Sequence, residues 1–220
     1  MSVVVLSKDE LIRVEVLKAS RTLFQRFGLF KTTMEDIAKA VGKGKSTLYY
    51  YYESKDEIFD AVIREDMQEV FSQVKAAVEK ACTAEEKLRM FTISKIRAIN
   101  QKANLYGIVF GEISENPQLI KGLKKNFEAQ ELELLRDILV FGIYNNEFKR
   151  ITDQDLDDLS HIMLSATRGI EMGLLEDCRI KKMGDRLEVI LDLICHGIKS
   201  GAGSQELKSG ARIQEPGARS

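Results

Sequence analysis

The 220-residue chain contains no tryptophan, only two prolines and almost no net charge. Scarce proline, with abundant glutamate, lysine and leucine, favours an all-helical fold. The three cysteines are far apart and form no Cys-x-x-Cys pair, so the pattern argues against disulfides and zinc sites and predicts buried, reduced thiols. The two histidines, His161 and His196, lack partners at metal-ligand spacing. We therefore expect no metal and no cofactor.

The sequence also lacks any long apolar run. A membrane-spanning helix needs roughly 20 consecutive apolar residues, and no segment approaches that length. The opening Val3–Leu6 segment is too short for a signal-peptide core and has no basic region before it. These absences predict a cytoplasmic protein that does not partner with a membrane.

The charge is unevenly divided along the chain. Residues 1–55 hold ten Lys+Arg against six Asp+Glu, which leaves +4. Residues 56–220 hold the remaining 23 Lys+Arg against 28 Asp+Glu, which leaves -5. A basic N-terminal part on an acidic remainder is typical of a DNA-binding head attached to a domain that does not bind DNA.

The starts of helices are marked by hydroxyl residues three positions before a carboxylate, the pattern of a capping box. Such pairs occur at Ser7–Glu10, Thr33–Asp36, Ser54–Glu57, Thr83–Glu86 and Thr152–Asp155, and Asn116–Pro117 marks a sixth start. Apolar spacing of three to four residues then predicts about nine helices. They cover approximately residues 8–27, 34–41, 45–52, 55–81, 84–102, 104–115, 117–146, 153–176 and 184–199. In the first, the expected buried face is Ile12, Val16, Ala19, Leu23 and Phe27.

The predicted fold is therefore all-α, with an N-terminal three-helix helix-turn-helix head and a C-terminal helical bundle. The expected domains are a DNA-binding head over residues 1–53 and an effector-binding and dimerisation domain over 54–200. Residues 201–220 are rich in Gly, Ser, Ala, Gln and Arg. Because such a composition buries too little apolar surface to offset chain entropy, we expect a disordered tail.

Residues 32–57 contain a short amphipathic helix, a turn at Gly42 and a second short helix, which together predict a helix-turn-helix. Leu48 and Tyr52, four residues apart, are expected to face inward. The outward face carries hydroxyls and an ammonium, which suit phosphate oxygens and base edges in a major groove. The residues of this face are Lys45, Ser46, Thr47, Tyr49, Tyr50 and Tyr51. Thr33 and Lys55 flank the face at helix starts as candidate phosphate anchors.

The head resembles the N-terminal domain of TetR-type transcriptional regulators over about residues 8–60. The resemblance rests on Thr32-Thr33, Ile37-Ala38, Gly42, Thr47-Leu48-Tyr49-Tyr50-Tyr51 and Ser54-Lys55-Asp56. It implies DNA contacts at Thr33, Lys45, Ser46, Thr47, Tyr49, Tyr50 and Lys55. The chain departs from the family at Lys43, which is usually apolar, and at Gly44, which is usually a capping Ser or Thr. It also departs at Ser46, usually glycine, and at Tyr52, usually phenylalanine.

The resemblance further implies a homodimeric repressor on a double-stranded DNA operator. Two-fold operators read by helix-turn-helix proteins have half-sites about 34–36 Å apart, which also favours a dimer. The candidate interface is formed by apolar and small residues of the last two helices, unless these pack only within the subunit. They are Leu159, Met163, Ala166, Ile170, Gly173, Leu187, Ile190, Leu191, Ile194 and Ile198.

Family members also release DNA when a small effector occupies a cavity in the helical body. For this chain we expect a mainly apolar effector of unidentified class. The candidate pocket residues are Phe71, Phe91, Ile96, Asn100, Tyr106, Phe110, Glu112, Phe127, Met163 and Arg168. Each of these has the alternative of being ordinary core.

Two other functions fit parts of the sequence. A helical partner-binding protein with a degenerate DNA-binding head would explain the departures at Lys43 and Gly44. A P-loop nucleotide hydrolase would explain Gly44-Lys45-Ser46-Thr47, but its pattern requires a glycine at the position of Lys39 and a preceding buried strand. We therefore expect that the protein is not an enzyme.

Overall fold

The computed structural model describes residues 7–102, 108, 111–112, 118 and 121–176. Within these ranges the regular elements are seven helices: α1 (Lys8–Lys31), α2 (Met34–Val41), α3 (Lys45–Tyr51), α4 (Lys55–Lys80), α5 (Ala84–Gln101), α7 (Lys121–Tyr144) and α8 (Asp153–Glu176). This confirms the all-α prediction, with seven described helices in place of about nine. The helix predicted at 184–199 and the tail at 201–220 lie outside the described residues, as does most of 104–115.

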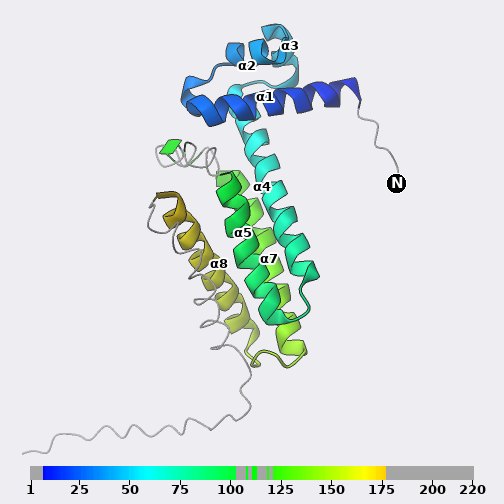
Figure 1. The fold of residues 1–220 in the computed structure, drawn as a ribbon, viewed down its shortest axis with the longest axis vertical. Coiled ribbons are helices and arrows are strands. Elements are labelled where there is room, and N and C mark those ends of the chain that lie inside the picture. Colours follow the sequence, from blue (N-terminus) through cyan, green and yellow to red (C-terminus); the bar gives the residue numbers. More distant parts are fainter. Residues whose placement is uncertain (1–6, 103–107, 109–110, 113–117, 119–120, 177–220) are drawn as a thin grey trace, which may run out of the picture.

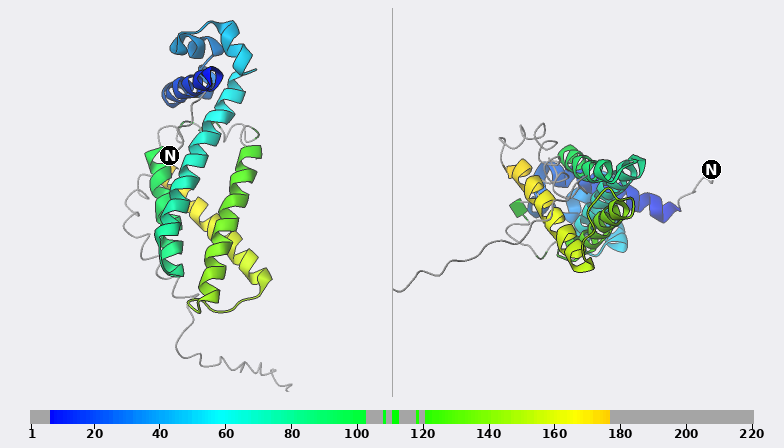
Figure 2. Two further views of the ribbon diagram at one scale, coloured as in Figure 1. Left: turned by 90° about the vertical axis from the view of Figure 1, so that its right-hand side faces the viewer. Right: turned by 90° about the horizontal axis from the view of Figure 1, so that it is seen from below.

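The helices form a head and a body joined by α4. Figure 1 shows α1, α2 and α3 grouped at one end of the molecule, with α4 running out of this group. The lower part of α4 packs beside α5 and α7, and α8 lies on the other side of α5 and α7 (Figure 2). The helix-turn-helix is therefore held at the far end of a long helical bundle.

Capping hydroxyls begin the helices where the sequence pattern predicts them. The hydroxyls of Ser7, Thr33, Ser54, Thr83 and Thr152 each accept a hydrogen bond from the backbone amide three residues later. These bonds satisfy amide groups that the first helical turn leaves without partners. The start predicted at Asn116–Pro117 falls outside the described residues.

The expected buried face of α1 is confirmed in part, since Val16 is buried and Ile12 and Leu23 pack against the head core. Val16, Leu17, Ser20 and Phe24 are buried, whereas Phe27 is exposed. Ser20 is part of the buried face, but a polar residue does not count in a pattern of apolar spacing. The pattern therefore selected Ala19 and Leu23 in place of Ser20 and Phe24. The helix also continues past its predicted end, with a kink at Gly28 where φ is +79°.

The interior is divided into two hydrophobic clusters that share α4. The first joins α1, α2 and α3 to Ile58, Phe59, Val62 and Ile63 of α4. Within it, the rings of Phe24 and Phe59 meet edge to face with centroids 5.4 Å apart. The second cluster joins the later part of α4, from Val70 onward, to α5, α7 and α8. One helix therefore contributes to both clusters, and Asp66 lies between its two buried stretches.

The structure describes one of the three cysteines, Cys82. Cys82 is exposed, so the prediction of a buried thiol is wrong at this position. Cys82 precedes the capping box of α5, in the connection from α4, which explains its exposure.

None of the helices within the described ranges is long and apolar enough to cross a membrane.

Candidate nucleic-acid interface

The outward face of α3 carries the polar side chains that the sequence placed there. Lys45, Ser46, Tyr49 and Tyr50 are exposed, and Tyr50 is 76% exposed against 47% for Tyr49. Thr47 is partly covered. Leu48 and Tyr52 are buried in the head core, as predicted. Figure 1 shows α3 at the outer end of the head, away from the body. This face can therefore reach a large ligand without obstruction by the bundle.

Tyr51 does not belong to the outward face, so its prediction as part of that face is wrong. Its side chain is only 9% exposed, and its hydroxyl donates a hydrogen bond of 2.8 Å to the Asp9 carboxylate on α1. The Arg13 guanidinium lies over the ring and donates to the Tyr51 carbonyl oxygen at 3.0 Å. The helical period explains this, because a residue three positions after Leu48 shares its face. The hydrogen bond to Asp9 and burial raise the pKa of Tyr51.

Thr33 is exposed at the start of α2, but its hydroxyl is engaged within the helix. The hydroxyl accepts from the Asp36 amide and donates to the Asp36 carboxylate at 2.6 Å. The hydrogen bonds that the Thr33 hydroxyl and backbone amide donate to the Asp36 carboxylate lower the pKa of Asp36. Glu35 and Asp36 also place two carboxylates on the first turn, where they offset the positive helix end. This end of α2 is therefore less favourable to phosphate than the sequence motif implied.

Lys55 has a role inside the head that the sequence did not reveal. Its ammonium donates to the carbonyl oxygens of Leu29, Phe30 and Thr32 at 2.9, 3.2 and 3.1 Å. An ammonium has three donors, so these carbonyls use all of them. Lys55 thus ties the start of α4 to the end of α1 with the same ammonium that the sequence assigned to a phosphate contact.

The turn before α3 explains the departures at Lys43 and Gly44. Gly42 adopts φ +69° and ends α2, and the amide of Lys43 donates to the Ala38 carbonyl at 3.0 Å. Lys43 is exposed, since the turn itself carries no inward side chain. Gly44 is the residue at the cap position of α3, and α3 has no side-chain cap hydrogen bond. The first turn of α3 is consequently held by the backbone and by the burial of Leu48.

The predicted effector residues that the structure describes lie in different surroundings. Phe91, Ile96 and Phe127 are buried in the body, and Phe71 and Met163 are partly buried. Glu112 points to the head instead, because its carboxylate accepts from the amides of Leu29 and Phe30 at 2.7 and 2.9 Å. Tyr106, Phe110 and the Asn100 side chain lie outside the described residues.

The interior of the body contains a cluster of charges, of which the sequence indicated only Arg168. Lys95 of α5, only 3% exposed, pairs with Glu131 of α7 at 2.8 Å and Glu171 of α8 at 3.1 Å. Arg168 pairs with Glu128 and Glu131 at 2.8 and 3.4 Å. Burial raises the pKa of Glu171. The paired charges lie on different helices and far apart in sequence, so only knowledge of helix packing could have paired them.

A hollow lies in the head. It is a groove of about 440 Å³ between α1 and α2. Its lining residues are Leu23, Phe27, Lys31, Thr32, Asp36, Lys39 and Ala40. None of the predicted effector residues belongs to it.

The predicted dimer residues of α8 have mixed environments. Leu159 and Met163 pack against the body core, whereas Ala166 is exposed and Ile170 is partly covered. Ile162, which the sequence reading did not select, is 63% exposed on the same helix. Leu187, Ile190, Leu191, Ile194 and Ile198 lie outside the described residues, as does the environment of Gly173.

The short helix α2, the tight turn at Gly42 and the open polar face of α3 define a helix-turn-helix DNA-binding protein. Residues 16–62 match the sequence model of the family described as "Bacterial regulatory proteins, tetR family". The "HTH-type transcriptional repressor KstR2" of Mycolicibacterium smegmatis is 27% identical over 147 residues, which are 66% of this chain and 71% of that protein.

Solved structures of other proteins have the same fold. A transcriptional regulator from Cytophaga hutchinsonii superposes with a TM-score of 0.66 at 25% identity, covering 84% of this chain and 97% of that one. GusR of Salmonella enterica has the same fold, with a TM-score of 0.68 at 22% identity and coverage of 87% and 97%. The N-terminal head, over residues 16–62, thus matches the tetR family of bacterial regulatory proteins, and the relatives named above are transcriptional regulators rather than enzymes.

Proposed function

We propose that this protein is a dimeric repressor that binds a palindromic operator and leaves it when a small effector binds. The observation that carries the proposal is the outward face of α3, where Lys45, Ser46, Thr47, Tyr49 and Tyr50 gather at the free end of the head. A helix of this kind fits a major groove, where hydroxyls and an ammonium meet base edges and phosphates. The M. smegmatis relative is named a repressor, which supports the direction of regulation.

The DNA-contacting set that we propose differs from the sequence prediction at two positions. Tyr51 is left out because its hydroxyl is bound to Asp9 inside the head. Lys55 is left out because its ammonium holds backbone carbonyls. Thr33 stays as a peripheral contact, since it is exposed beside the face even though its hydroxyl caps α2.

The dimer that we propose uses the outer side of α8. Ile162 and Ala166 are four residues apart, and both are exposed on this helix, as is Gly169 three residues further on. Small residues in such a stripe allow close approach of a second helix, and Ile162 supplies apolar area to bury. The helix predicted at 184–199 would complete the interface.

The effector that we propose is small and mainly apolar. It would lie among α4, α5, α7 and α8, near Phe91, Ile96 and Phe127. The ion cluster around Lys95 adds a condition, because an unpaired buried charge is costly. An effector that separates α5, α7 and α8 must leave these ion pairs intact or replace their partners with its own polar groups. Release then requires that it binds one head spacing more tightly than the other.

The proposal is tested by selecting binding sites from a random DNA pool at near-physiological salt and measuring the mass of the resulting complex. We expect an enriched palindrome, with half-sites one or more helical turns apart, carrying two subunits. Binding without sequence preference that vanishes as salt rises would reject operator recognition and favour the partner-binding alternative.

Two isoleucine variants test the dimer surface. Ile162→Glu should convert the dimer to a monomer in sedimentation experiments, because it places a carboxylate in the proposed interface. Ile151→Glu is the matched control, since Ile151 is also exposed but precedes α8. Dimers that survive Ile162→Glu, or are lost equally in both variants, would remove this face from the proposal.

A further inference from the structure

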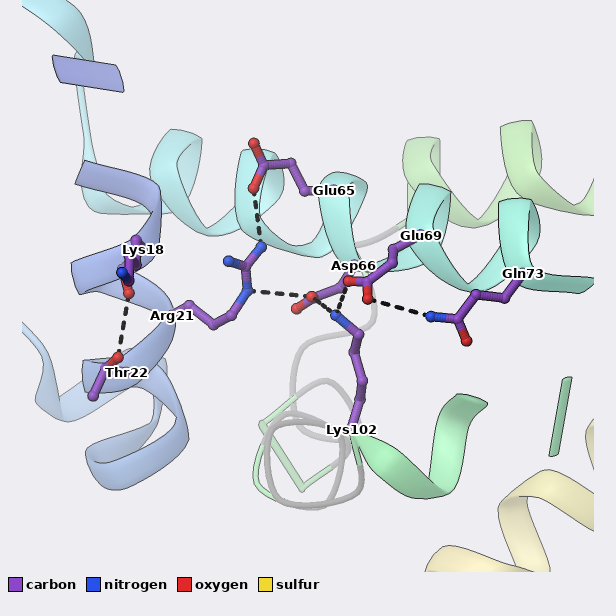
Figure 3. Close-up of polar contacts among 8 residues, drawn as sticks. All are labelled: Lys18, Arg21, Thr22, Glu65, Asp66, Glu69, Gln73 and Lys102. Atoms are coloured by element: carbon purple, nitrogen blue, oxygen red, sulfur yellow. Dashed lines mark hydrogen bonds and ion pairs between the residues drawn. The ribbon is translucent and has the colours of Figure 1, made fainter. Parts of the chain in front are cut away.

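Asp66 is a fully buried carboxylate at the point where the head meets the body. It lies on α4, between the stretch that packs in the head core and the stretch that packs in the body core. Figure 3 shows that Arg21 of α1 and Lys102, which follows the last residue of α5, both reach its carboxylate. The Nε atom of Arg21 lies 3.2 Å from Oδ1 of Asp66. One carboxylate therefore joins three helices that belong to two structural units.

The flanking carboxylates make Asp66 the shared element of this group. Glu65 accepts from Arg21 Nη2 at 2.9 Å, and Glu69 accepts from the Lys102 ammonium. Both flanking side chains are largely exposed, and each binds one of the two cations. Only Asp66 binds both, and a buried carboxylate needs such cations because burial without them is costly. The nearby carboxylates outweigh the effect of burial and raise the pKa of Lys102, so the ammonium stays charged in its place.

A second carboxylate joins the same two units. Glu112, from the part of the chain between α5 and α7, accepts from the amides of Leu29 and Phe30 just after the kink in α1. Gly28 makes this approach possible, since a Cβ atom there would lie 2.5 Å from Oε1 of Glu112. Both links attach α1 to residues at or beyond the end of α5. The head is thus held by side-chain contacts in addition to the continuous helix α4.

We propose that Asp66 is the pivot that couples the end of α5 to the head, through Lys102 on one side and Arg21 on the other. When Lys102 moves, the Asp66 carboxylate that it binds moves with it. Because the same carboxylate binds Arg21 of α1, the orientation of the head follows the position of the end of α5. The inference rests on the proposed function in one respect, because it identifies the path by which an effector in the body changes the spacing of the heads.

The coupling is measured as a distance between head and body in the full-length protein without DNA or effector. Spin labels are attached at Lys39→Cys on α2 and Arg97→Cys on α5, both exposed, after Cys82, Cys178 and Cys195 are replaced by serine. Labelled subunits are mixed with an excess of unlabelled protein, so that distances within one subunit dominate. We expect one narrow distance distribution in the parent and a shifted or broadened one in Lys102→Met. Lys75→Met is the matched control, since Lys75 is exposed on α4, and should leave the distribution unchanged.

An unchanged distribution in Lys102→Met would overturn the proposal. If Lys102→Met does not fold, Glu69→Gln weakens the hold on Lys102 without leaving Asp66 bare. That variant should give a smaller change of the same kind, and no change would equally overturn the proposal. Because the distances are measured without DNA, a failed operator selection leaves this result standing and the two failures remain distinguishable.

Discussion

The substitution Lys55→Met separates a structural lysine from a DNA-contacting one. The Lys55 ammonium donates to three carbonyl oxygens at the end of α1. Its removal therefore deletes the three hydrogen bonds that connect the start of α4 to α1. Methionine keeps most of the aliphatic length and removes only the charge and the donors. The matched substitution is Lys45→Met, because Lys45 is exposed at the start of α3.

The expected magnitude follows from the environment of the three bonds. A hydrogen bond to a charged group contributes about 1.5–3 kcal/mol when its loss leaves a buried partner unsatisfied. Here the site is only partly covered, so water replaces part of the loss. We expect Lys55→Met to lower the free energy of unfolding by about 1–3 kcal/mol in total. Lys45→Met should change it by less than about 0.5 kcal/mol, as is usual for surface substitutions.

The salt dependence of DNA binding should show the opposite pattern. Each phosphate contact that is lost lowers the slope of log K against log salt by about 0.9. Lys45→Met should therefore reduce the slope by about 0.9 per subunit if Lys45 contacts a phosphate. Lys55→Met should leave the slope unchanged once the measurement is made on folded protein. Denaturant titration and operator titrations at several salt concentrations provide both quantities.

A Lys55→Met variant that reduces the salt slope, and unfolds at the same denaturant concentration as the parent, would contradict the structural role of Lys55. That outcome would mean that the ammonium leaves its carbonyl partners and contacts phosphate when DNA is bound.

Other substitutions test separate parts of the account. Gly44→Ser should stabilise the head by about 0.5–1 kcal/mol, because it supplies the missing cap of α3 at a φ that serine permits. Gly42→Ser should destabilise the head, because serine is strained at φ +69°. Equal effects of the two substitutions on the free energy of unfolding would show that the hydroxyl introduced by Gly44→Ser does not cap α3. Gly142→Ala should lower the melting temperature, since its Cβ would lie 2.2 Å from the ring of Phe148, and an unchanged melting temperature would show that the ring moves freely. Burial raises the pKa of Glu171, so the folded state binds its proton more tightly and stability falls as pH rises from about 4.5 through the raised pKa. Glu171→Gln should flatten that pH dependence in denaturant titrations, and an unaltered slope would assign it to another group.

Local sequence signals predicted much of the fold because they act within a few residues. The capping hydroxyls at Ser7, Thr33 and Ser54 form the expected bonds wherever the structure describes them. The buried stripe of α1 could not be predicted in the same way. Ser20 lies on that stripe, and whether a small polar residue is buried depends on the helix packed against it.

In the candidate site, too, local features could be predicted from the sequence and contacts between distant residues could not. Leu48 and Tyr52 were predictable as inward residues, and Tyr50 as outward, from the helical period alone. The partners of Tyr51 and Lys55 were not predictable, because Asp9 and the carbonyl oxygens of residues 29–32 are distant in sequence. The same holds for the pairs around Asp66 and Lys95. Long side chains with charged ends reach partners that only the folded chain brings close.

The most direct measurement is photocrosslinking from α3 to the selected operator. An azidophenylalanine in place of Tyr50 should crosslink to bases inside each half-site, since this side chain is 76% exposed on the proposed reading face. The control places the same residue at Tyr144, which is 84% exposed at the end of α7 in the body, and should give no crosslink. Crosslinks confined to position 50 and to the half-sites are the predicted result. No crosslink from position 50, or equal crosslinking from both positions, would contradict the claim that α3 reads the operator.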